Sequence, residues 1–218
     1  WAPNCAEWAI AALGVHTAGA VLIPLNTRFK GPEATDILRR SRARLLLCVT
    51  DFLDVDYVSL LGDRSPLPDL TEICALRGAV GDADLPWAAL VGRADDVAAD
   101  AARERSAQLT ADDLCDILFT SGTTGAPKGA MLRHGASVRA FDDWASVVGL
   151  DHGDRYLIVN PFFHAFGLKA VILACLAKGA TIIPHPVFDV PSVMAQVEAE
   201  RVTMLPGPPA IYQTILDH

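Results

Sequence analysis

The residues best suited to chemistry lie in one short stretch, Phe119-Thr-Ser-Gly-Thr-Thr-Gly-Ala-Pro-Lys-Gly129. Eight of its eleven residues are Gly, Ser, Thr or Lys, and the apolar run 117–119 leads into it. Glycines allow the backbone to turn tightly and to approach a ligand. Successive N–H groups in such a turn form a concave anion site, to which hydroxyl and ammonium groups add further donors. The stretch therefore predicts a loop that binds phosphate groups.

Two familiar nucleotide-binding patterns do not fit this loop. A Walker-type loop requires Gly-Lys followed by Ser or Thr, whereas Lys128 lies between Pro127 and Gly129. No GxGxxG sequence follows a predicted strand, which excludes the nicotinamide-dinucleotide class. A solvated Ser/Gly turn is the remaining alternative, but turn chemistry alone does not require this order of hydroxyls, glycines, proline and lysine. We therefore predict a nucleotide-phosphate loop of another kind.

The elements around the loop follow the pattern of a parallel α/β sheet. We predict helices over residues 4–19, 32–41, 133–148, 168–177, 190–200 and 208–216, and strands over residues 21–25, 45–49, 72–76, 114–120, 156–160, 180–184 and 202–205. Asn4 is the expected N-cap of the first helix, and Gly179 ends the helix over residues 168–177. Helices that alternate with apolar strands indicate an α/β fold of parallel-rich sheets flanked by helices. We expect two successive subdomains, residues 1–110 and residues 111–218, the second with the loop.

Composition and charge exclude several classes of partner. The chain has 218 residues, of which 51% are hydrophobic, with 18 basic and 26 acidic residues and a net charge of −8. Nucleic acid and anionic membrane both require a basic face, so neither is expected as the main partner. No apolar run approaches the roughly 18 residues of a transmembrane segment. The chain begins with neither Met nor a signal-peptide pattern, so we expect it to start inside a gene product.

Cysteine usage indicates a reducing compartment. The five cysteines are scattered, odd in number and never spaced as CxxC. This pattern predicts buried free thiols, with no disulfide framework and no zinc site. A cytoplasmic location is therefore expected.

Several motifs resemble those of the adenylate-forming superfamily, which contains acyl-CoA synthetases, firefly luciferase and the adenylation domains of peptide synthetases. Thr120 to Gly129 resembles the phosphate loop of that family, and residues 18–26, 160–167 and 202–209 are similar to three further motifs in content and order. The resemblance covers nearly the whole chain. It implies part of a larger N-terminal domain and is closest to actinobacterial acyl-CoA ligases.

The resemblance implies a reaction in two halves. A carboxylate attacks the α-phosphorus of ATP, which gives acyl-adenylate and pyrophosphate, and the thiol of CoA then displaces AMP. ATP, Mg²⁺, CoA and a carboxylic acid are thus the implied cofactors and substrates. We expect Thr124 or Thr120 to help hold Mg²⁺ and Lys128 to neutralise the departing pyrophosphate. The expected phosphate contacts are Thr120, Ser121, Gly122, Thr123, Thr124, Gly125 and Lys128.

His164 is the candidate catalytic residue on the carboxylate side. It lies among Phe162, Phe163 and Phe166, a pattern that by itself also fits a hydrogen-bonded core histidine. In the family the matching residue borders the acyl carboxylate and ATP. The resemblance therefore implies a positioning group, because a carboxylate is already ionised near pH 7 and needs no base. His134 is expected to be structural.

In the family, the adenine site, the ribose-binding aspartate, the hinge and the catalytic lysine of the C-terminal domain lie beyond the position that matches His218. We therefore expect residues 1–218 alone to be inactive, since many transition-state contacts are missing. Exposed apolar surface should favour homo-oligomers. The expected substrate of the complete enzyme is a fatty acid or a steroid-ring-derived propanoic acid, in lipid metabolism. A non-catalytic nucleotide-binding module and an adenylation domain that serves a carrier protein are the alternatives.

Overall fold

The computed structural model describes residues 1–120 and 127–218, which form two compact units. The first unit comprises residues 1–2 and 10–134, and the second comprises residues 3–9 and 135–218. Each unit contains sheet strands and a buried core. Five of the predicted phosphate contacts, Ser121, Gly122, Thr123, Thr124 and Gly125, lie outside the described residues.

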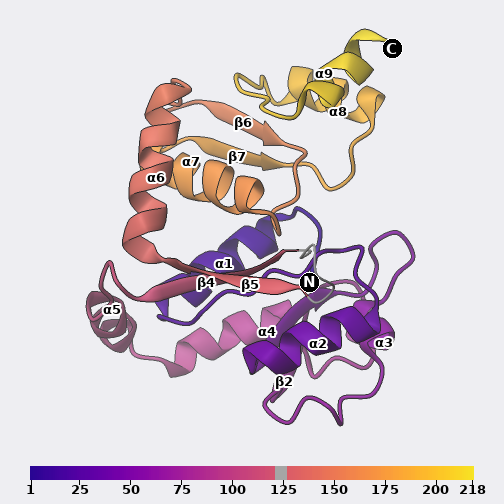
Figure 1. Cartoon of the computed structure of the whole chain (residues 1–218), viewed down its shortest axis with the longest axis vertical. Helices are drawn as coiled ribbons and strands as arrows, with labels where there is room; N and C mark the ends of the chain where they lie inside the picture. The colour runs from indigo at the N-terminus through magenta and orange to yellow at the C-terminus, as the bar shows by residue number, and fades with distance from the viewer. Residues whose placement is uncertain (121–126) are drawn as a thin grey trace. The chain divides into compact units, whose positions relative to one another are not determined.

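Figure 1 labels most of the elements along the chain. The first part of the chain forms α1 (Ala6–Thr17), α2 (Gly31–Ser41), β1 (Leu45–Val49), α3 (Tyr57–Leu61), β2 (Glu72–Arg77), β3 (Leu85–Pro86), α4 (Trp87–Gly92), η1 (Arg93–Asp96), α5 (Ala99–Ala107), β4 (Leu114–Thr120) and β5 (Lys128–Arg133). The remainder forms α6 (His134–Val147), β6 (Arg155–Ile158), the π-helix η2 (Phe166–Leu173), α7 (Ala174–Lys178), β7 (Thr181–Pro184), α8 (Val190–Ala199) and α9 (Pro209–Leu216).

The first unit contains a parallel sheet with the strand order β1-β2-β3. Cys48, Ile73 and Cys74 are fully buried in it, as expected for parallel strands that are covered on both faces. The charged helix α5 has no buried residue, which agrees with its solvated sequence. The predicted strands over residues 45–49 and 72–76 are confirmed, and so is the parallel-rich α/β fold class.

The loop is carried by an antiparallel hairpin, β4–β5, in which Thr120 pairs with Lys128 and Ile117 pairs with Met131. We predicted β4 but not β5, whereas the predicted helix over residues 133–148 is present as α6. The short strand was missed because nearly all of β5 is exposed, with Met131 at 70%. A strand without a buried face has no alternation of apolar and polar residues from which it can be recognised.

The second unit contains the parallel pair β6–β7, whose strands lie side by side in Figure 1, with η2 in contact with β6. Its core includes Leu157, Ile183 and Val193. The predicted helix over residues 168–177 is present but begins as a π-helix and ends at Gly179. The glycine has φ +73° and a left-handed conformation, as predicted for a C-cap.

Two predicted strands are reduced to single bridges. Residues 21–25 and 202–205 contribute only the pairs Leu22↔Asp116 and Tyr156↔Met204. Pro24 lies within the first segment and Pro206 directly follows the second. Since proline cannot donate a backbone hydrogen bond to a neighbouring strand, it limits the extension of both ladders.

The predicted N-cap of the first helix is wrong. Helix α1 begins at Ala6, and the buried side chain of Asn4 binds four backbone groups of the second unit instead. Local spacing suggested a cap because an Asn before a helical pattern is usually one. In the structure, the Asn4 side chain forms hydrogen bonds to residues far along the chain and therefore does not cap the helix.

All five cysteines are free and buried, as the sequence predicted. Burial raises the pKa of the Cys48 and Cys74 thiols to about 11 and that of Cys175 to about 12. Thiols with such pKa values hold their protons near neutral pH and are poor nucleophiles. These cysteines therefore belong to the core and not to a reactive site.

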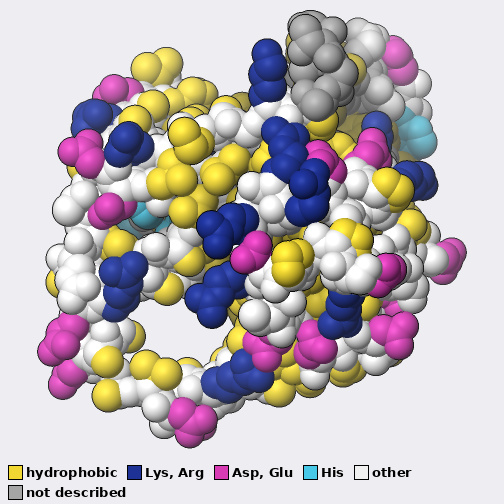
Figure 2. All heavy atoms as spheres, turned by 60° about the horizontal axis from the view of Figure 1, so that its bottom comes forward, with side chains coloured by type: hydrophobic (Ala, Val, Ile, Leu, Met, Phe, Trp, Pro, Cys, Tyr) yellow, Lys and Arg dark blue, Asp and Glu magenta, His cyan; other side chains and the backbone are white. Residues whose placement is uncertain are grey.

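Some apolar side chains are exposed among charged ones, as Figure 2 shows for one face of the molecule. The most exposed are Val147 at 86%, Leu216 at 81% and Met131 at 70%. In the part of the chain that the structure describes, no helix is long and apolar enough to cross a membrane. The expected self-association through apolar surface stays a prediction.

Candidate functional site

The hairpin β4–β5 brings the two ends of the predicted phosphate loop together. Thr120 pairs with Lys128, both side chains are exposed, and Oγ1 of Thr120 donates to the carbonyl oxygen of Lys128 at 3.5 Å. Gly129 allows this close pairing, because a Cβ atom there would lie 2.7 Å from Cγ2 of Ile117. The pairing thus places a hydroxyl-bearing and an ammonium-bearing side chain, both exposed, directly opposite each other at the loop end of the ladder.

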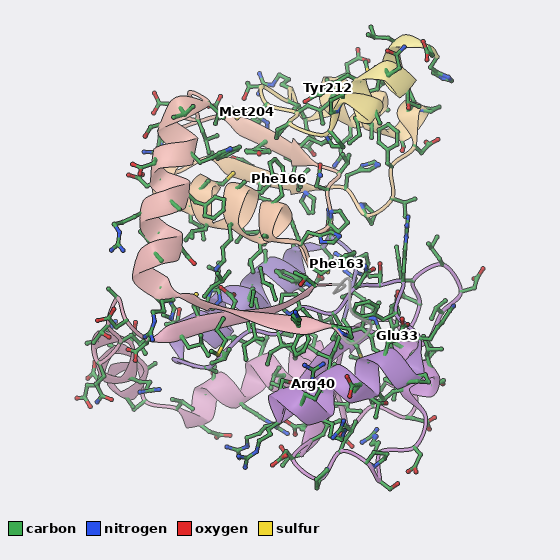
Figure 3. All side chains as sticks on the ribbon, viewed as in Figure 1. Glu33, Arg40, Phe163, Phe166, Met204 and Tyr212 are labelled. Carbon is green, nitrogen blue, oxygen red and sulfur yellow. The ribbon has the colours of Figure 1, made fainter. Side chains whose placement is uncertain are left out.

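Arg40 contacts the chain on both sides of the predicted loop, and sequence reasoning did not find it. Its Nη1 donates to the carbonyl oxygen of Pro127 at 2.8 Å, and its guanidinium carbon lies 5.2 Å from the ring centroid of Phe119. A guanidinium group over an aromatic face is attracted to the ring. Arg40, labelled in Figure 3, also donates from Nη1 to Oδ2 of Asp36 at 3.3 Å, and Asp36 lies one turn earlier on α2. Arg40 therefore holds together the residues that precede Thr120 and Lys128.

The other end of β4 is anchored in the core of the first unit. Asp116 is fully buried, and its Oδ1 lies 2.9 Å from Nε2 of His16 while its Oδ2 accepts from Sγ of Cys115 at 2.9 Å. A buried carboxylate needs such partners because desolvation is costly. The ring of His134 lies 5.6 Å from that of His16 in an edge-on arrangement, which agrees with the structural role expected for His134.

His164 lies in a tight turn that leads from β6 into η2. Its backbone N–H donates to the carbonyl oxygen of Pro161 at 3.1 Å, and its carbonyl oxygen accepts from Leu168 at 3.0 Å. The imidazole is exposed but lies 4.8 Å from the ring of Phe163, and partial desolvation lowers its pKa. A lowered pKa favours the neutral imidazole at pH 7. Neutral imidazole offers a hydrogen bond without attracting a second anion.

The aromatic neighbours of His164 divide between core and surface. Phe162 is fully buried and its ring centroid lies 5.5 Å from that of Trp8. Phe163 and Phe166, both labelled in Figure 3, are partly buried. The ring centroid of Phe166 lies 5.9 Å from that of Trp144, in an edge-on arrangement. Phe162 is thus a core residue that anchors the turn in the second unit.

Gly167 is required by the tight approach of η2 to the turn. A Cβ atom at this position would lie 2.2 Å from the carbonyl oxygen of Pro161. The clash involves a backbone atom, so only a shift of the backbone could remove it. We expect Gly167→Ala to destabilise the protein by about 1–3 kcal/mol, as other overpacked sites do. The measurement is the midpoint of urea unfolding.

Gly14, in the middle of α1, is the matched control for Gly167. A Cβ atom there would meet nothing within 4 Å, and alanine in a helix interior is favoured over glycine by about 0.5–1 kcal/mol. Gly14→Ala should therefore raise the midpoint while Gly167→Ala lowers it. Equal shifts for both variants would show that the approach to Pro161 is not tight in solution.

The structure brings Thr120 and Lys128 together in the first unit and places His164 in the second. Within residues 1–120 and 127–218, no group of three His, Cys, Asp or Glu side chains is arranged to hold a metal ion. The described carboxylates therefore offer no clustered Mg²⁺ site. The Mg²⁺ contact expected of Thr124 falls outside the described residues and stays a prediction.

The chain matches the family model for AMP-binding enzymes over residues 1–218. It belongs to the AMP-binding enzyme family. It is 45% identical, over its whole length, to a 3-(7a-methyl-1,5-dioxo-octahydro-1H-inden-4-yl)propanoyl:CoA ligase of Rhodococcus jostii, of which it covers 43%. It is 46% identical to the ligase of the same name from Mycobacterium tuberculosis, again over 100% of the chain and covering 42% of that protein.

Solved structures agree with the fold. The inhibitor-bound N-terminal domain of FACL13 from Mycobacterium tuberculosis superimposes with a TM-score of 0.81 and 29% identity, over 100% of this chain and 50% of that one. The chain thus spans less than half the length of the two relatives it resembles in sequence. The expected resemblance to actinobacterial acyl-CoA ligases is confirmed.

Proposed function

We propose that this chain supplies the phosphate-binding and carboxylate-binding part of an ATP-dependent acyl-CoA ligase that forms AMP. The observation that carries the proposal is the 45% and 46% identity, across the whole chain, to two proteins named as propanoyl:CoA ligases. The geometry of the hairpin also supports the proposal, because Thr120 and Lys128 pair at the end where the predicted phosphate loop begins and ends. The proposed reaction joins a carboxylic acid to CoA by way of an acyl-adenylate.

In this proposal the residues act through position and charge. Negative charge accumulates on the β- and γ-phosphates as pyrophosphate leaves, and the ammonium group of Lys128 with the loop donors stabilises it. ATP arrives as its Mg²⁺ complex, and Mg²⁺ neutralises the phosphates. Neutral His164 orients the attacking carboxylate. A base is unnecessary, because the carboxylate is ionised at pH 7.

We further propose that the acid is a propanoic acid attached to a fused-ring system. Two relatives named for such a substrate share 45% and 46% of their residues with this chain, whereas the long-chain fatty-acid ligase FadD13 shares 31%. A straight-chain fatty acid is the competing substrate class. The five free, buried thiols support a reducing compartment such as the cytoplasm.

The proposal is tested with the full-length gene product, ATP·Mg²⁺, CoA and three acids: a fused-ring propanoic acid, a straight-chain fatty acid and an aromatic acid. AMP, ADP, acyl-adenylate and the CoA thioester are quantified. We expect AMP and thioester in equal amounts, with the largest kcat/KM for the fused-ring acid. A preference for the fatty acid would contradict the proposed substrate class. ADP in place of AMP would contradict the proposed AMP-forming reaction. Acyl-adenylate that accumulates without thioester would indicate a carrier-protein acceptor, because AMP is released when an acceptor takes the acyl group. Nucleotide binding without turnover would indicate a non-catalytic module.

A further inference from the structure

Both polar atoms of the Asn4 side chain form hydrogen bonds inside the second unit. It is 4% exposed, and its Nδ2 donates to the carbonyl oxygens of Ile158 at 3.3 Å, Asn160 at 2.9 Å and His185 at 3.2 Å. Its Oδ1 accepts from the backbone N–H of Phe162 at 2.7 Å. One amide thus binds four backbone groups from three segments that lie more than 150 positions further along the chain.

These four groups lie where the strands of the second unit end. Ile158 is the last residue of β6, and His185 follows the last residue of β7. In open α/β sheets, ligands bind outside the carboxyl ends of the parallel strands. Asn4 therefore occupies the edge of this sheet at which the segment containing His164 begins.

The hydrogen bonds of Asn4 are made close to the turn that carries His164. The N–H of Phe162 is held by Oδ1 of Asn4, and the carbonyl oxygen of Pro161 is held by the N–H of His164 at 3.1 Å. Gly167 closes the other side of the turn against Pro161. Phe162 lies only two residues before His164, so a displacement of Phe162 should also displace His164.

No other side chain of this size supplies the same set of contacts. The carboxamide has a donor and an acceptor at one end, and both are needed here. Asp can accept from Phe162 but cannot donate to the three carbonyl oxygens. Leu satisfies none of the four groups and leaves them buried without partners, which is costly.

We propose that Asn4 is a positioning residue for the carboxylate side of the reaction, which it serves by holding Asn160 and Phe162 and thereby the imidazole of His164. The inference rests on the proposed function. It concerns residues of the second unit only. It predicts that the contribution of Asn4 appears in the use of the carboxylic acid and not in the binding of ATP.

The test compares Asn4→Asp with Asn26→Asp in the full-length gene product. Oδ1 of Asn26 accepts from the N–H of Arg28 at 2.9 Å, a role that a carboxylate can keep, whereas Asn4→Asp loses three donated bonds. Carboxylate-dependent exchange of pyrophosphate into ATP gives separate KM values. We expect Asn4→Asp to raise KM for the acid about tenfold or more, with KM for ATP·Mg²⁺ within about twofold of wild type. Asn26→Asp should change neither.

A second measurement keeps the inference testable where Asn4→Asp does not fold. Asn4→Gln retains both polar groups one methylene further out, and the titration of His164 is followed by NMR in the folded protein. In the wild type partial desolvation lowers the pKa of His164. Release of the turn should hydrate the imidazole and raise that pKa towards its ordinary value of about 6.5.

The outcomes separate the inference from the proposed function. Wild-type protein without carboxylate-dependent exchange would refute the proposed function, and the titration of His164 would then test only whether Asn4 positions the imidazole. Active wild type with an unchanged KM for the acid in folded Asn4→Asp, or an unchanged pKa of His164 in Asn4→Gln, would overturn the inference. Equal changes in both KM values would reduce Asn4 to a structural residue.

Discussion

Lys128→Ala is expected to lower kcat for the exchange of pyrophosphate into ATP by about 100- to 1000-fold in the full-length gene product. This is the size of the loss when one preorganised donor to a developing negative charge is removed. Lys128 is exposed and paired with Thr120 at the end of the hairpin, so its ammonium group is available to an anion. Binding of the carboxylic acid without ATP, measured by calorimetry, should change little.

Lys178→Ala is the control for loss of a lysine. Its ammonium group lies 2.7 Å from Oδ1 of Asp142 within the second unit and also donates to Ser146. An ion pair of this kind on the surface contributes little, so exchange should be unaffected. If Lys128→Ala exchanges pyrophosphate as fast as Lys178→Ala, the assignment of Lys128 to the leaving group is wrong.

Arg40→Ala is expected to raise KM for ATP·Mg²⁺ about tenfold, a smaller effect than that of Lys128→Ala. Its guanidinium group binds the carbonyl oxygen of Pro127 and covers the ring of Phe119. Without it, the residues that precede Thr120 and Lys128 lose their common support from α2. Because these contacts of Arg40 are made to the residues that border the loop, KM for the carboxylic acid should stay near the wild-type value.

The neighbouring Arg39 provides a matched control for Arg40. It lies on the same helix and donates to the same Asp36, at 2.8 Å, with a side chain that is 56% exposed. Arg39→Ala should leave both KM values unchanged. Arg40→Lys should recover part of the loss, since lysine keeps the charge but lacks the planar group that covers Phe119. Identical kinetics for Arg39→Ala and Arg40→Ala would show that the contact of Arg40 with the hairpin does not affect ATP binding.

The predicted elements that survive in the structure are those with a strong local signal. The run 45–49 is continuously apolar and forms β1, and the glycine after residues 168–177 ends α7 as a C-cap. The order of residues in the loop, together with three further motifs, led to the family that the whole chain matches. Local patterns suffice where the residue type itself carries the chemistry or the conformation.

The missed features depend on contacts between distant residues. Asn4 has the sequence of an N-cap, but its partners are 154 to 181 positions away. Arg40 is one of three arginines near the end of α2, and only the folded chain shows which of them reaches Pro127, 87 positions away. Strand β5 is stabilised by pairing with β4 and not by burial of its own side chains. No periodicity within a window of the sequence contains this information.

The central claim is that the protein activates a carboxylic acid by transferring AMP to it. Full-length protein is incubated with ATP·Mg²⁺, CoA and a fused-ring propanoic acid whose carboxylate carries ¹⁸O, and the products are analysed by mass spectrometry. Attack of the carboxylate on the α-phosphorus leaves one labelled oxygen on the phosphate of AMP when CoA displaces it. Labelled AMP is expected in the same amount as the CoA thioester. Label in inorganic phosphate with unlabelled nucleotide would contradict it, because the activated intermediate would then be an acyl phosphate.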